Sequence, residues 1–128
     1  AEALSRSGVR AERFNLAVTD TGRLMMAMVD AATVVFGTPT VLTGAHPMVA
    51  CAAFVINALK PKVRFASVIG SYGWGGKSVE QITSAISGLK AEILEPVVIK
   101  GRPTPADLAR VEGLADIIVS KHREAGLL

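Results

Sequence analysis

The sequence predicts an α/β fold in which helices cover both faces of a mostly parallel sheet. Two segments, residues 33–37 and 63–70, are continuously apolar, as is typical of parallel strands that are buried on both faces. Helical patterns lie between and after them, and each of the two strands is followed by a loop rich in Gly, Ser or Thr. Because short helices that join parallel strands form right-handed crossovers, we expect a three-layer α/β/α sandwich.

Two further segments are weaker strand candidates with the features of a sheet edge. Residues 93–99 are mostly apolar, but Pro96 removes one backbone hydrogen-bond donor, which is tolerated mainly in an edge strand. Residues 9–16 are interrupted by three charged side chains, which also favours an edge over the centre of a sheet. The sequence therefore predicts four strands.

Apolar residues at helical spacing predict the core-facing sides of the helices, and residues 48–59 form an Ala-rich apolar helix in which Cys51 is expected to be a small core residue. The other helical stripes are Leu24, Met25, Met28 and Val29; Val79, Ile82, Ile86 and Leu89; and Leu108, Val111, Ala115 and Ile118.

Helix starts are also visible in the sequence. Thr104 can cap a helix whose first position suits Pro105 and whose first turn suits Asp107. Residues 19–23 are interpreted as the N-cap segment of another helix, and His46 as a turn or capping residue rather than a general base.

The composition favours one domain, residues 1–128, and argues against two classes of partner. Half of the 128 residues are apolar and a fifth are charged, which suits one ordinary core. The net charge of +3 is spread along the chain, so nucleic acid is not an expected partner. The longest apolar stretch is shorter than the ~20 residues that cross a bilayer, so no membrane partner is expected. Without a secretory signal pattern, and with one cysteine, the expected localisation is cytoplasmic.

Two loops are the candidate binding segments, because ligands of open parallel sheets bind beyond the carboxyl ends of the strands. The first loop, residues 38–47, offers three hydroxyl groups and a helix start. The second, residues 71–77, holds the single Tyr and the single Trp among glycines. Trp74 is either a stacking platform for a flat ligand or a residue that caps the core edge or a subunit interface.

The spacing of the residues argues against three other kinds of site. A hydrolase nucleophile elbow needs Gly two residues before the Ser, and Ile69 stands there relative to Ser71. The glycines of the second loop do not match the dinucleotide fingerprint. With only His46 and His122 and no ligand-like spacing, a protein-only metal site is not expected.

Five motifs, in order along nearly the whole chain, resemble one family: FGTPT at 36–40, GAHP at 44–47, LKPK at 59–62, IGSYGWGG at 69–76 and LEP at 94–96. The chain is similar to the flavodoxin-like domain of the flavodiiron proteins, also called A-type flavoproteins. The segment at 69–76 is the most specific of these motifs.

The resemblance implies FMN at the carboxyl edge of a parallel sheet of order 2-1-3-4-5. FMN would pass electrons from a donor protein or reduced cofactor to a diiron site that reduces oxygen or nitric oxide. That site belongs to a metallo-β-lactamase-like domain or subunit, usually across a head-to-tail dimer, so a homo-oligomer is expected and the chain is not expected to be a complete catalyst. The flavin-binding residues implied are Thr38, Pro39, Thr40, Val41, Leu42, Thr43 and Gly44 on one loop, and Ser71, Tyr72, Gly73, Trp74, Gly75 and Gly76 on the other, with Tyr72 or Trp74 as the stacking ring.

The chain departs from the family at its N-terminus, where the first strand and the hydroxyl-rich phosphate loop are lacking. Residues 1–7 resemble the end of the first helix, and residues 9–16 the second strand. An alternative function is therefore a fragment that binds no flavin and acts as a folding or dimerisation module through residues 48–59. A free-standing flavodoxin is disfavoured, because such carriers are strongly acidic and this chain is mildly basic.

Overall fold

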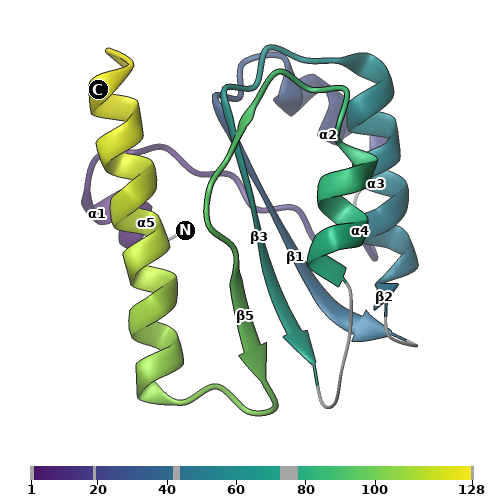
Figure 1. The fold of residues 1–128 in the computed structure, drawn as a ribbon. Coiled ribbons are helices and arrows are strands. Elements are labelled where there is room, and N and C mark those ends of the chain that lie inside the picture. The colour runs from purple at the N-terminus through teal and green to yellow at the C-terminus, as the bar shows by residue number, and fades with distance from the viewer. Residues whose placement is uncertain (1, 19, 42–43, 73–77, 128) are drawn as a thin grey trace.

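The computed structural model describes residues 2–18, 20–41, 44–72 and 78–127. It confirms the α/β class, with a mainly parallel sheet between two layers of helices (Figure 1). In chain order the elements are α1 (Glu2–Arg6), α2 (Thr21–Met28), β1 (Thr33–Val41), β2 (Gly44–Ala45), α3 (Pro47–Leu59), β3 (Phe65–Tyr72), α4 (Ser78–Ala85), β4 (Glu92–Ile93), β5 (Val97–Lys100) and α5 (Pro105–Glu124).

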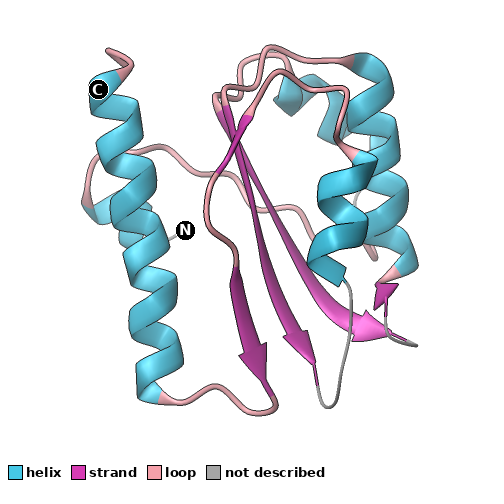
Figure 2. Cartoon of the chain, in the orientation of Figure 1, coloured by secondary structure: helices cyan, strands magenta, loops and turns pink. Residues whose placement is uncertain are grey.

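The sheet is centred on β3, which pairs in parallel with β1 on one side and with both β4 and β5 on the other. Helices α2, α3 and α4 cover one face and α1 and α5 the other (Figures 1 and 2). Each face has its own core. The larger core contains Phe36, Val68 and Ile82, and the smaller one contains Val97 and Ile118.

The predicted strand over residues 93–99 is at an edge, as expected, but it is not continuous. Pro96 falls in a break between β4 and β5, because a proline cannot donate to the strand ladder. The buried hydroxyl of Ser67 on β3 lies opposite the break and donates to the carbonyls of Leu94 and Glu95 at 3.3 and 3.4 Å. The Ser67 side chain thus supplies hydrogen bonds where the backbone ladder is interrupted.

The predicted strand over residues 9–16 is wrong. This segment has no regular secondary structure before a turn at 16–18, and it crosses from the α5 side of the sheet, where α1 lies, to α2 on the other side (Figure 1). Strand hydrogen bonds need a partner, and within the described ranges no strand pairs with it. On the side away from β3, β1 is also mostly unpaired within the described ranges, because it pairs there only with β2, at Thr40 and Val41.

The helix predictions are confirmed in position and corrected in detail. Asp20, His46 and Thr104 are N-caps, and Thr104 forms a reciprocal capping box with Asp107. Cys51 is exposed, because the buried side of α3 is made instead by Val49, Ala52, Ala53 and Ile56.

Two other residues expected in the core, Val29 and Leu108, are exposed. Val29 is the C-cap of α2, beyond the last helical residue. Leu108 lies in the first turns of α5, whose buried residues begin only at Leu114. Both positions are at helix ends, where the sheet gives less cover.

Candidate functional site

The two candidate segments meet at one edge of the sheet. In the parallel pairing of β1 with β3, Thr38 lies opposite Gly70 and Pro39 opposite Ser71. The carboxyl ends of the two strands are therefore side by side, next to the end of β5 (Figure 2). This is the place at which open α/β sheets bind their ligands.

Thr38 links the end of β1 to the start of α3. Its side chain is only 4% exposed, and its Oγ1 accepts a hydrogen bond of 2.8 Å from the backbone N–H of His46. The Nδ1 atom of His46 in turn accepts from the N–H of Met48 at 3.1 Å, which caps α3. These two bonds fix the position at which the first candidate segment returns to the helix.

The first candidate segment is more ordered than the predicted loop. Residues 38–41 continue β1, and Gly44 belongs to β2, which folds back antiparallel so that Thr40 pairs with Ala45 and Val41 with Gly44. A proline is compatible with β1 at position 39, because an edge strand does not need every N–H. Leu42 and Thr43 lie outside the described residues.

The second candidate segment also begins within a strand. Ser71 and Tyr72 are the last residues of β3 and pair with Ile99 and Lys100 of β5. Gly73, Trp74, Gly75 and Gly76 lie outside the described residues, and the stacking role expected for the aromatic rings stays a prediction. The strand extends because β5 offers a pairing partner that the local sequence does not reveal.

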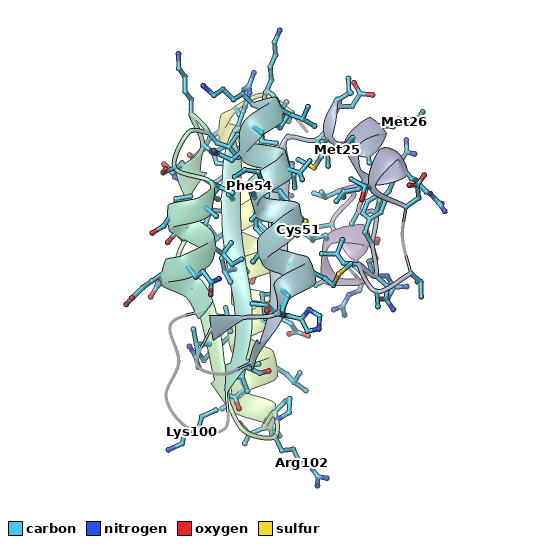
Figure 3. All side chains as sticks on the ribbon, turned by 90° about the vertical axis from the view of Figure 1, so that its right-hand side faces the viewer. Met25, Met26, Cys51, Phe54, Lys100 and Arg102 are labelled. Atoms are coloured by element: carbon cyan, nitrogen blue, oxygen red, sulfur yellow. The ribbon has the colours of Figure 1, made fainter. Side chains whose placement is uncertain are left out.

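The electrostatic character of this edge favours an anion. Helices α3, α4 and α5 all begin on this side of the sheet (Figure 1), and the N-terminal ends of helices carry partial positive charge. Lys100 and Arg102 are exposed at the same end of the molecule (Figure 3). Hydrogen bonds from Thr104 lower the pKa of Asp107, whose carboxylate is thereby committed to capping α5.

Sequence reasoning missed the role of His122, which lies at the opposite edge. Its side chain is 8% exposed, its Nε2 lies 2.6 Å from Oγ1 of Thr33, and its ring stacks on Phe65 at 6.0 Å between centroids. Thr33 and Phe65 begin β1 and β3, so this cluster sits at the amino ends of the strands. The available signal was the spacing of four residues from Ile118, which places His122 on the buried side of α5.

The described part of the chain lacks two further features. No group of three or more His, Cys, Asp or Glu side chains among those residues could hold a metal ion. No helix among them is long and apolar enough to span a bilayer.

Comparison with known proteins gives sequence relatives, while no family model matches the chain. The chain is 31% identical over 97 residues to rubredoxin-oxygen oxidoreductase of Megalodesulfovibrio gigas, a match that covers 75% of the chain and 24% of that protein. It is 27% identical over 122 residues to nitric oxide reductase of Moorella thermoacetica, which covers 94% of the chain and 31% of that protein. The chain thus spans about a quarter to a third of the length of these relatives.

Solved structures show the same fold. The rubredoxin oxygen:oxidoreductase structure from Desulfovibrio gigas matches 97% of the chain and 31% of its own, with a TM-score of 0.91 and 26% identity. The flavodiiron core of Flv1 from Synechocystis matches 98% of the chain and 31% of its own, with a TM-score of 0.86 and 21% identity, a likeness of fold. Together, sequence and fold place the chain among the flavodoxin-like domains of the flavodiiron proteins.

Proposed function

We propose that residues 1–128 form an FMN-binding electron-transfer domain of a flavodiiron-type oxidoreductase. The observation that carries the proposal is the register of β1 with β3, which sets Thr38 and Pro39 beside Gly70 and Ser71 at one carboxyl edge. The likeness to a protein named rubredoxin-oxygen oxidoreductase supports an electron-transfer role.

The described part of this edge fits FMN in its chemistry. FMN combines a flat ring with a phosphate, and the edge offers three helix starts and two exposed cations for an anion. The ends of β1 and β3 lie side by side at this edge, where open α/β sheets bind their ligands. Residues Thr38 to Gly44 would lie on one side of the flavin and Ser71 to Gly76 on the other.

The protein's contribution is positioning and tuning. FMN, when bound, supplies the electron-transfer chemistry, while stacking, hydrogen bonds and nearby charge set its potential. Thr38 holds the turn into α3 through His46, and Tyr72 or Trp74 would stack on the ring and exclude water from it.

The acceptor and donor lie outside this chain in the proposal. The acceptor would be the diiron site of a metallo-β-lactamase-like domain or subunit that reduces oxygen or nitric oxide. The names of the two sequence relatives, an oxygen oxidoreductase and a nitric oxide reductase, support these two substrates. The donor would be a redox protein or a reduced cofactor.

A titration of FMN into the purified chain tests this function. Binding should quench flavin fluorescence and shift the visible absorption bands. Trp74→Ala should weaken binding by roughly 0.5–1.5 kcal/mol, about the value of an aromatic stacking contact. Ile117→Ala, on the exposed side of α5, is the matched control and should bind FMN as the wild type does.

A second candidate is a folding or dimerisation module that binds no flavin. It is favoured by the exposed side of α3, which is apolar and uncharged. An unchanged flavin spectrum at a large excess of FMN would exclude flavin binding by this chain and leave this second candidate.

A further inference from the structure

The turns at the amino ends of the strands share one end of the molecule with the carboxyl end of α5 (Figure 1). Backbone hydrogen bonds hold neighbouring turns side by side. The N–H of Arg64 donates to the carbonyl of Ala32 at 2.8 Å, and the N–H of Glu92 donates to the carbonyl of Arg64 at 2.9 Å. We define the amino-end surface as residues 29–32, 60–64, 86–92 and 121–127.

The net positive charge of the chain resides on the amino-end surface. The surface holds six basic and three acidic residues, a balance of +3 that equals the net charge of the whole chain. Of the 14 basic and 11 acidic residues, the eight of each sign that lie elsewhere cancel. The fold thus gathers at one end a charge that the sequence distributes along the chain. The charged residues of the surface are Lys60, Lys62, Arg64, Lys90, Lys121 and Arg123, with Asp30, Glu92 and Glu124.

Most of these basic groups face solvent. Lys60, Lys62 and Lys90 are exposed. Lys121 lies 3.1 Å from Glu92, and among the described residues this is the only ion pair of the amino-end surface. The exposed lysines are therefore open to an external anion.

The stability of the helices accounts for only some of these cations. Lys60 caps the carboxyl end of α3, and Lys121 and Arg123 lie in the last turn of α5, where a cation stabilises a helix end. Lys62 and Lys90 lie beyond the helices, in the connections that lead to β3 and β4, and this stabilisation falls off before it reaches them. Helix stability therefore does not explain the concentration of charge.

The composition of the amino-end surface distinguishes among anionic partners. Its ranges contain no Phe, Tyr or Trp and its His122 is buried, so no exposed ring could stack on nucleic-acid bases. Protein interfaces are depleted of charged residues at their centre, whereas Lys62 and Arg64 lie in the central turn, before β3. An anionic bilayer attracts a basic surface through water, which leaves the charges solvated. A lipid surface is thus the partner that this composition fits best.

We propose that the amino-end surface binds the anionic headgroups of a lipid bilayer. Clusters of about 4–8 Lys and Arg residues are typical of segments that bind anionic lipids, and this surface has six. Such contact is peripheral and does not require the spanning helix that the described residues lack. Lys100 and Arg102, at the opposite end of the molecule (Figure 3), and the candidate flavin edge would face away from the bilayer.

Sedimentation of the chain with lipid vesicles tests the proposal. The chain should bind vesicles of phosphatidylcholine that contain roughly 30% phosphatidylserine, and not vesicles of phosphatidylcholine alone. Binding should weaken as the salt concentration rises, because salt screens exposed charges. Lys62→Glu combined with Lys90→Glu should weaken binding by about tenfold or more, and Lys62→Gln combined with Lys90→Gln should weaken it less.

The matched control is Lys100→Glu combined with Arg102→Glu, which makes the same change in net charge at the other end. The eight residues of β3 separate the two ends by about 26 Å, against a Debye length of about 10 Å at 0.1 M salt. The control should therefore bind within about twofold of the wild type. The substituted side chains are exposed, and circular dichroism should show an unchanged helix content in each variant.

Three results would overturn the proposal. The first is a wild type that does not bind the phosphatidylserine vesicles at low salt. The second is an effect of Lys62→Glu with Lys90→Glu that is no larger than that of the control pair. The third is retention of the chain on immobilised duplex DNA or poly-L-glutamate at a salt concentration that releases it from the vesicles, which would assign the surface to a nucleic acid or an acidic protein.

Discussion

The residue-scale feature with the clearest consequence is the buried contact of His122 with Thr33 and Phe65. It joins the last helix to the amino ends of the two main strands. Burial lowers the pKa of His122 below its ordinary value of 6.5, because the charged ring is poorly solvated there. The folded state therefore favours the neutral ring.

The stability of the fold should depend on pH through this residue. The pKa of His122 is lower in the folded state, so the unfolded chain binds a proton first as the pH falls. The contribution to the free energy of unfolding is complete above 6.5 and is lost progressively as the pH falls from 6.5 toward the lowered pKa. Urea unfolding of the wild type and His122→Gln across this range should show a steeper loss in the wild type.

The control for this effect is the other histidine. His46→Asn keeps an N-cap residue on α3 and should retain the wild-type pH dependence. If His122→Gln and the wild type lose stability in parallel as the pH falls, burial of His122 is not the source of the dependence.

At the scale of elements, a polar contact ties α3 to the turn that follows α4. Asn57, which interrupts the apolar run of α3, accepts a hydrogen bond of 2.7 Å from the N–H of Gly88, just after α4. A Cβ atom at Gly88 would lie 2.7 Å from the same Asn57 oxygen. The glycine thus allows the contact by its lack of a side chain.

Two glycine substitutions should have opposite effects. Gly88→Ala should push Asn57 away and lower the free energy of unfolding by about 1 kcal/mol, the typical net value of such a hydrogen bond. Gly113→Ala, within α5 and with nothing within 4 Å of the new methyl group, should raise it by about 0.5–1 kcal/mol. Urea denaturation of both variants measures the two changes, and shifts of the same sign would contradict this account.

The elements also show what the sequence could and could not predict. Caps such as Thr104 were predictable, because a cap is a local contact within three residues. The strand expected at 9–16 and the unbroken strand at 93–99 were wrong, because pairing depends on neighbours distant in the chain. Cys51 was misplaced because α3 is apolar on every side, so its pattern does not show which side meets the sheet.

At the scale of the whole molecule, the candidate site was predictable in place and less so in form. The rule that ligands bind at the carboxyl ends of parallel strands selected residues 38–44 and 71–76, and the pairing of β1 with β3 brings the described parts together. Their form differs from open loops, because Thr38 to Val41 and Ser71 to Tyr72 continue the strands.

An amide NMR map of the chain with and without FMN tests flavin binding at this edge, because it reports both binding and its location. We expect the largest shifts at the carboxyl ends of β1 and β3, including Thr38 and Ser71. The amides of Thr33 and Phe65, at the amino ends of the same strands, should change little. Unchanged spectra, or shifts centred on the amino ends of the strands or on α5, would contradict flavin binding at the carboxyl edge.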